Sequence, residues 1–297
     1  MTIYNGQAMT LDLTYPLHAK RWGNPQGIPI LALHGWLDNA ASFDHLAPLF
    51  PELQWVVLDL PGHGHSAHKP PGQTLHIIDV VIEIAQVIEA LGWTQCLLIG
   101  HSLGAAISSL LAGLIPERFL GVMLLDGLGP ITAPAEQGPA QARLYLEESL
   151  KLPYKTLPRY STLAAAVHAR QRVSDMLPSS TQLLVERGII QTQTGDYQWR
   201  TDPRLLLPVA SPLTEPQVHA FLNQIRAPLC LLQPQSGYPF PPAELQARRA
   251  AIPQLQYYSL PGRHHVHLDA PNPVANILQD FLMNHTTLAD KKLVNKK

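Results

Sequence analysis

Short apolar runs recur along the chain, and most of them end at a glycine, a proline or a polar residue. Such runs are typical of parallel strands that are buried on both faces. The spacing of apolar residues between several of the runs is helical, at residues 75–91, 103–114 and 271–282. The pattern predicts a mostly parallel, doubly wound α/β sheet. Its six strands are expected within residues 28–35, 54–62, 95–102, 120–127, 227–234 and 255–262, with an antiparallel edge hairpin at 8–23.

The alternation of strands and helices stops between residues 130 and 213. This stretch is rich in Ala, Leu, Arg, Gln and Pro, and its helical pattern is interrupted at Pro153, Pro158 and Pro178. Strand-and-helix order resumes near residue 214. We therefore expect one sheet domain, residues 1–129 and 214–285, interrupted by a helical cap insertion at 130–213. Residues 286–297 are expected to form a flexible basic tail.

Composition narrows the class of protein further. Hydrophobic residues make up 46% and charged residues 14% of the 297 residues, and the formal net charge is -1. These values favour a compact globular protein and argue against a nucleic-acid partner. Because we find neither a signal-like start nor a membrane-spanning apolar run, we expect a soluble cytoplasmic protein. Cys96 and Cys230 are expected to be buried, reduced thiols, with a disulfide or reactive pair as the alternative.

The first candidate for chemistry is the sequence Gly-His-Ser-Leu-Gly at residues 100–104. It lies between an apolar strand and an Ala-rich helix, which is the setting of a nucleophile elbow. Gly100 and Gly104 allow the backbone to turn sharply and the neighbouring helix to pack close. They form the elbow with His101, and Ser102 would project its hydroxyl from the carboxyl edge of the sheet. The following helix N-terminus, at Leu103, favours developing negative charge. An ordinary strand-to-helix turn is the alternative.

A serine hydroxyl needs a histidine base, which in turn is oriented by a carboxylate. Three histidines lie between the last predicted strand and the last helix. His264 is the leading candidate base because its loop can bring the ring over Ser102; His265 and His267 are alternatives, and His267 is interpreted as structural. A solvated loop or a His-rich metal site are further alternatives. No Cys or acidic spacing resembles a closed zinc set, so neither a metal nor a cofactor is expected.

The carboxylate is assigned by its place on the sheet. Asp126 ends the run at 120–127 and therefore lies on the same edge as Ser102. The run at 227–234 is followed by no acid before Glu244. Asp126 is the candidate acid, and the alternatives are Asp269, no functional acid, or a structural role for Asp126 in its turn.

Two further loops are expected at this edge. The turn after residues 30–33 can expose the backbone N–H of Trp36, which would pair with that of Leu103 as an oxyanion hole. The segment Asp59–Ser66 follows another strand and is expected to border the same cleft. An ordinary turn is the alternative for each.

Four segments, "LHGW", "DLPGHGHS", "GHSLG" and "HHVHLDAP", occur in this order. In combination they resemble the α/β-hydrolase superfamily, while "YQWRTDPRL" and "HHVHL" resemble serine hydrolase-like proteins and related bacterial hydrolases. The resemblance implies the α/β-hydrolase fold, a lid over an acyl pocket, and a triad of Ser102, Asp126 and His264. Many relatives carry the acid after the following strand, where this chain has "PQSGYP".

Serine at the elbow favours acyl transfer, because relatives that open epoxides or displace halide use aspartate there. The expected function is a serine hydrolase that cleaves a small to medium carboxylic ester, or a thioester or lactone, through an acyl-enzyme. The expected partner is thus a small-molecule, ester-type substrate. The alternatives are an inactive binding protein with this fold, motivated by the missing acid in "PQSGYP", and a cofactor-free perhydrolase that uses the same triad.

Overall fold

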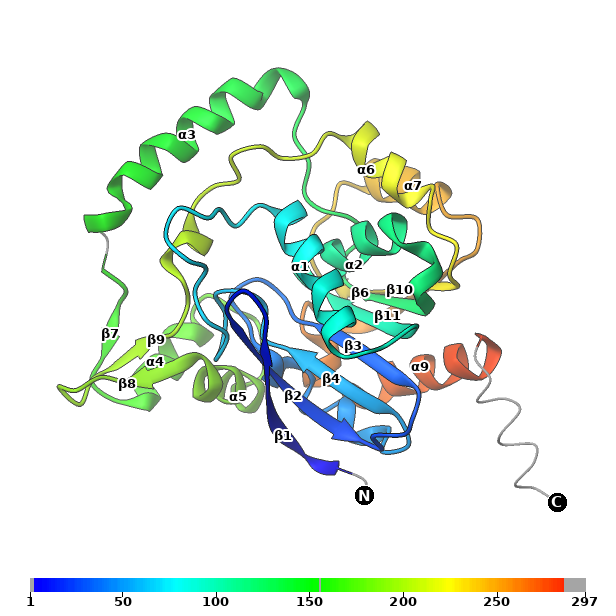
Figure 1. Ribbon diagram of the computed structural model, residues 1–297, viewed down its shortest axis with the longest axis horizontal. Helices are drawn as coiled ribbons and strands as arrows, with labels where there is room; N and C mark the ends of the chain where they lie inside the picture. Colours follow the sequence, from blue (N-terminus) through cyan, green and yellow to red (C-terminus); the bar gives the residue numbers. More distant parts are fainter. Residues whose placement is uncertain (1–2, 155, 286–297) are drawn as a thin grey trace.

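The computed structural model describes residues 3–154 and 156–285 and has an eight-stranded sheet at its centre (Figure 1). The strand order is β1-β2-β4-β3-β5-β6-β10-β11. Strand β2 is antiparallel to its neighbours β1 and β4, and the remaining neighbours are parallel. The predicted α/β sheet and its edge hairpin are confirmed. The strands are β1 (Ile3–Asp12), β2 (Pro16–Gly23), β3 (Pro29–Leu33), β4 (Gln54–Leu58), β5 (Cys96–His101), β6 (Phe119–Leu125), β10 (Leu229–Ser236) and β11 (Leu255–Arg263).

Both faces of the sheet are covered, which explains why its central strands are apolar throughout. In β3, Leu31 and Leu33 belong to one core cluster, whereas Ile30 and Ala32 belong to the other. Successive side chains of a strand point to opposite faces, so each strand contributes to both cores. The first core includes α1 (Ile77–Ala90), α2 (Leu103–Leu114) and α6 (Glu215–Leu222), and the second includes α9 (Pro271–His285). Two further helices are α7 (Pro242–Ala250) and α8 (Val266–Asp269).

Residues 130–213 contain helices, as expected, and also a small sheet that the sequence pattern did not predict. The three strands pair in the order β7-β9-β8 and are only two or three residues long, too short for a periodic signal. Helix α3 stands apart from the central sheet, whereas α5 packs against the short helix η1 (Ala40–Phe43) (Figure 1). The elements are α3 (Gly138–Lys151), β7 (Arg159–Tyr160), α4 (Leu163–Gln171), α5 (Pro178–Gly188), β8 (Ile189–Gln191) and β9 (Tyr197–Trp199).

Three further expectations concern the C-terminal tail, membrane-spanning helices and the two cysteines. The predicted basic tail, residues 286–297, lies outside the described residues. Within residues 3–154 and 156–285, none of the helices is both long enough and apolar enough to cross a membrane. Cys96 and Cys230 are buried and free, as predicted, and burial raises the pKa of each thiol to about 12.

Candidate active site

Ser102 occupies a sharp turn between β5 and α2. Its backbone has a φ of 51° and a ψ of -111°, a strained conformation for a residue with a side chain. The two neighbouring glycines permit this turn. A Cβ on Gly100 would lie 2.3 Å from the Gly104 carbonyl oxygen, and one on Gly104 would lie 2.1 Å from the Leu33 carbonyl oxygen. The sequence therefore has glycine at both positions because only glycine lets β3, β5 and α2 approach so closely.

His264 and Asp126 are hydrogen-bonded to each other. The His264 Nδ1–H donates to Asp126 Oδ2 over 2.6 Å, and the carboxylate is fully buried. Asp126 follows β6 and has a φ of 50°, a left-handed conformation that aspartate tolerates better than most residues. Among the described residues, the Ser102 hydroxyl makes no hydrogen bond to the His264 ring. The structure thus brings the candidate acid and base together, and Ser102 lines a cavity nearby.

The loop after β10 supplies a backbone donor where many relatives supply the acid. The amide of Tyr238 donates to Asp126 Oδ2 over 2.7 Å, so this oxygen accepts two hydrogen bonds. A Cβ on Gly237 would lie 2.3 Å from the same oxygen. The sequence analysis missed both residues. The available signal was the glycine in "PQSGYP", which leaves room for a carboxylate from the neighbouring strand.

The alternative residues of the sequence analysis have other partners. His265 Nε2 donates to Asp38 Oδ2 over 2.9 Å, and His267 Nε2 lies 2.8 Å from the Ser42 hydroxyl. Burial, together with His265, holds the pKa of His267 well below its usual value, so its ring is neutral. Asp269 accepts a hydrogen bond from the amide of Leu177. Of the candidate acids and bases, only Asp126 and His264 meet.

The orientation of the Trp36 amide depends on His34. The His34 Nδ1–H donates to the Gly35 carbonyl over 2.7 Å, and its Nε2 accepts from the Leu60 amide over 2.9 Å. Burial lowers the pKa of His34, which matches this neutral form. Since the C=O and N–H groups of a trans peptide point in opposite directions, the Trp36 N–H points away from His34.

Leu103 provides the second amide of the expected pair. It is the first residue of α2, so its N–H is one of the amides that have no partner within the helix. The amide of Gly104 donates to the His34 carbonyl over 3.0 Å and ties the Trp36 loop to the start of α2. Both Trp36 and Leu103 border the cavity that Ser102 lines.

A cavity of about 440 Å³ lies beside Ser102, between the sheet domain and residues 130–213. Among the described residues of its wall, the carboxyl and guanidinium side chains are those of Asp126 and Arg204, and both are paired. Burial lowers the pKa of His63, also in the wall, to about 3, so this ring is neutral. The cavity therefore suits an uncharged apolar group. Its aliphatic and aromatic lining is Trp36, Leu60, Leu75, Ile77, Val80, Leu103, Ala106, Ile107, Ile131, Tyr145, Leu205, Leu207, Val209, Ala210, Leu213, Tyr238 and Phe240.

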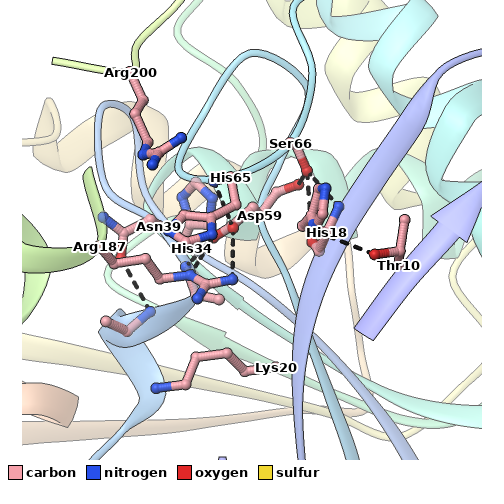
Figure 2. A network of polar contacts seen from close by, with 12 residues as sticks. Thr10, His18, Lys20, His34, Asn39, Asp59, His65, Ser66, Arg187 and Arg200 are labelled. Carbon is pink, nitrogen blue, oxygen red and sulfur yellow. Dashed lines mark hydrogen bonds and ion pairs between the residues drawn. The ribbon is translucent and has the colours of Figure 1, made fainter. Parts of the chain in front are cut away.

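The segment Asp59–Ser66 borders the cavity through Leu60, Pro61 and His63, as expected. Asp59 itself has a different role, because it pairs with Arg187 of α5 at 2.7 Å and 3.0 Å (Figure 2). Burial alone would raise the pKa of Asp59, but Arg187 and the hydrogen bonds to the carboxylate lower it. This ion pair fixes α5 to the sheet domain.

Asp38, His101 and His265 form a buried group that offers one carboxylate oxygen and two imidazole nitrogens. These atoms lie within 4.8 Å of one another, and such a donor set can bind a transition metal. However, Asp38 Oδ1 already accepts from Arg170 over 2.8 Å. Because Arg170 offsets the negative charge of Asp38, a divalent cation would leave a net positive charge in a buried place. The group is better suited to a polar network.

The sheet order, the turn at Ser102 and the covering helices define an α/β-hydrolase fold. A model of the alpha/beta hydrolase fold family matches residues 28–176. The chain belongs to this family, as its motifs indicated.

Its relatives include proteins named as serine hydrolases. The chain is 31% identical over 281 residues to a probable serine hydrolase of Drosophila melanogaster, covering 90% of this chain and 84% of the relative. It is 30% identical over 306 residues to serine hydrolase-like protein 2 of Homo sapiens, covering 93% and 95%. Among solved structures, a hypothetical protein of Pseudomonas aeruginosa PAO1 matches with a TM-score of 0.88 and 38% identity, covering 93% of this chain and 99% of that one. These likenesses support a hydrolase.

Proposed function

We propose that this protein is a serine hydrolase that cleaves a carboxylic ester, a thioester or a lactone with an uncharged, apolar acyl group. The observation that carries the proposal is the 2.6 Å hydrogen bond between His264 and Asp126, at the edge of the sheet where Ser102 lines the cavity. This bond supports an active hydrolase over an inactive binding protein, because it supplies the carboxylate that the loop after β10 lacks.

The proposed reaction begins when the Ser102 hydroxyl attacks the carbonyl carbon of the substrate. His264 Nε2 takes the hydroxyl proton, and Asp126 holds the ring by its Nδ1–H and stabilises the imidazolium that forms. The negative charge that develops on the carbonyl oxygen is met by the N–H groups of Trp36 and Leu103.

The tetrahedral intermediate then collapses with cleavage of the bond to the leaving group. His264 returns the proton to the departing alcohol or thiol, which leaves the acyl group on Ser102. Water attacks the acyl-enzyme by the same route, and its proton passes through His264 to the Ser102 oxygen. The products are a carboxylic acid and an alcohol or thiol; a lactone gives both groups in one molecule.

We also propose that residues 130–213 act as a cap over the acyl pocket, with residues 1–129 and 214–285 as the catalytic core. This segment contributes Ile131, Tyr145 and the stretch 204–213 to the cavity wall. The cap would therefore choose the acyl group by apolar contact and exclude water from the reacting carbonyl.

Hydrolysis of p-nitrophenyl esters of increasing acyl length tests the function directly. Each methylene that enters the cavity removes apolar surface from water, with a gain of about 0.8 kcal/mol. This gain corresponds to about a fourfold rise in kcat/KM per methylene. We expect kcat/KM to rise at this rate and to level off once the chain fills the cavity.

A matched series with a carboxylate at the end of the acyl chain is the control for that test. Arg204, the one guanidinium among the described residues of the cavity wall, is paired with Asp202, so the charged esters are expected to be poor substrates. Equal turnover of both series would contradict the proposed apolar acyl site. Absence of turnover for every ester and thioester tested would contradict the proposed activity.

A second prediction concerns Gly237, which the sequence analysis overlooked. The Cβ of Gly237→Ala would lie 2.3 Å from Asp126 Oδ2, so the carboxylate or the loop that carries residue 237 must shift, which disturbs the hydrogen bond to His264. A misplacement of about 1 Å costs roughly 10²-fold in rate, and we expect kcat to fall by about this factor. Steady-state kinetics with the best ester would measure it.

Gly138→Ala is the matched control for this substitution. Gly138 begins α3, and an added Cβ there meets no atom within 4 Å. Its activity should equal that of the parent. Parent-like kcat in Gly237→Ala would show that the placement of Asp126 does not limit turnover.

A further inference from the structure

Two arginines of the cap form buried ion pairs with aspartates of the core. Arg170 of α4 donates to Asp38 Oδ1 over 2.8 Å, and Arg187 of α5 donates to Asp59 over 2.7 Å and 3.0 Å. Asp38 and Asp59 are both almost completely buried, and each arginine is largely buried. In both pairs a cap cation neutralises a carboxylate that would otherwise be costly to bury.

The two pairs differ in what else the carboxylate binds. Asp59 accepts from the backbone amides of Ala40, the first residue of η1, and of His65, in the loop after β4. Asp38 Oδ2 instead accepts from the ring of His265, which follows the proposed base in the chain. The Arg170 pair therefore reaches the residue next to His264 through one side-chain hydrogen bond, whereas the Arg187 pair reaches this segment less directly, through η1, where Ser42 contacts His267.

That segment has few restraints from the sheet itself. His264 follows β11, which is the last strand of the sheet and has β10 as its neighbour on one side. Its backbone carbonyl accepts from His101 Nε2–H over 3.0 Å, which ties it to the elbow. Arg263 donates to the carbonyl of Asp175 in the cap. Side chains from the elbow, the core and the cap therefore hold the segment beyond Arg263, where the pairing of β11 with β10 ends.

The charges in this region are consistent with a fixed network. Burial would raise the pKa of Asp38, but His265, Arg170 and His101 outweigh it and hold that pKa well below its usual value. Asp38 is therefore ionised at neutral pH, with one oxygen on the cap arginine and the other on the His265 ring. Loss of either group would leave an oxygen of this buried carboxylate without its hydrogen bond.

We propose that Arg170 is a positioning residue for the reaction, acting through Asp38 and His265 on the backbone of His264. This inference rests on the proposed function. It means that the seating of α4 on the core helps to set the geometry of the base, so that the cap contributes to the chemical step as well as to substrate binding. Arg170 and Asp38 do not line the cavity.

Because Arg170 is outside the cavity, its loss should affect kcat and leave KM unchanged. Without Arg170, Asp38 loses its cap partner, and the His265 ring and the loop before it are held less firmly. His101 and Arg263 still hold the segment, so we expect a partial loss in Arg170→Gln. The expected fall in kcat is about tenfold or more, up to the roughly 10²-fold that a 1 Å misplacement costs.

The experiment compares Arg170→Gln, Arg170→Lys and Arg187→Gln with the parent. Arg187→Gln removes an ion pair of the same kind between cap and core, but one whose carboxylate bonds backbone amides rather than the residue next to His264. For each protein, kcat and KM are measured with the ester that the parent hydrolyses best. The concentration of active sites is taken as the concentration that reacts with a fluorophosphonate, and the melting temperature is recorded. Hydrogen exchange of residues 263–269 provides a second readout that needs no activity.

The inference predicts that Arg170→Gln lowers kcat at constant KM and speeds exchange in residues 263–269. Arg170→Lys, which keeps the charge, should restore most of the kcat and slow the exchange again. Arg187→Gln should change kcat and the exchange of residues 263–269 less than Arg170→Gln does, whatever its melting temperature. Parent-like kcat in Arg170→Gln, or an equal loss in Arg187→Gln, would overturn the inference. If the parent neither labels nor hydrolyses any ester, the proposed function fails, and unchanged exchange in Arg170→Gln would then overturn the positioning role independently.

Discussion

Replacing Ser102 with alanine is expected to lower kcat by about 10⁶-fold, the scale of loss seen when the serine of a catalytic triad is removed. Alanine keeps the Cβ and so leaves the strained turn between β5 and α2 unchanged. The substitution therefore removes the nucleophile without altering the fold. Intact-mass analysis after treatment with a fluorophosphonate gives the clearest measurement. We expect one adduct on the parent and none on Ser102→Ala.

Two further variants make this labelling experiment specific. His264→Ala should also lose the adduct, because without a base the hydroxyl is a poor nucleophile at neutral pH. Ser108→Ala is the matched control: Ser108 is a buried serine of α2 whose hydroxyl has no hydrogen-bond partner among the described residues. It should label like the parent. A folded parent without an adduct would favour the binding-protein alternative, and an adduct that persists in Ser102→Ala would show that another residue reacts.

The second large effect is expected at Asp126. Asp126→Asn should reduce kcat by about 10⁴-fold, as when the carboxylate of a triad is neutralised in other enzymes. Asparagine has nearly the same shape, and its oxygen can still accept from the Tyr238 amide that bonds Asp126 Oδ2. The loss would therefore report on the negative charge that stabilises the imidazolium of His264 and on the ring tautomer.

Asp269→Asn is the matched control because Asp269 was the alternative acid of the sequence analysis. Its carboxylate accepts from the Leu177 amide, which an asparagine oxygen can also do. We expect its kcat to stay near that of the parent. Steady-state kinetics on both variants, with circular dichroism to check folding, would decide the assignment. Near-normal turnover in Asp126→Asn would exclude Asp126 as the required acid.

The sequence predicted the elements of the sheet well because their signals are local. Apolar runs that end in glycine or proline mark the parallel strands, and helical spacing marks α1, α2 and α9. The elbow is local too, since one strand, one turn and one helix make it. The strands β7, β8 and β9 were missed because two or three residues carry no periodicity.

The surroundings of Asp126 could not be predicted from the sequence. Its partner His264 is 138 residues away, and the Tyr238 amide is 112 residues away. Whether these groups meet depends on the strand order β5-β6-β10-β11, which places the loops after β6, β10 and β11 side by side. The pairing of Arg170 with Asp38 depends in the same way on how α4 packs on the core.

By itself, the sequence determined which segments become strands and helices, where the backbone must turn sharply, and which side chains capable of chemistry stand at the carboxyl ends of strands. These properties depend on the backbone preferences and apolar spacing of neighbouring residues. Only the tertiary structure decided that His264 bonds to Asp126, that Gly237 leaves room for this carboxylate, and that Arg170 reaches Asp38. Contacts between distant residues follow from strand order and helix packing, which are properties of the whole folded chain.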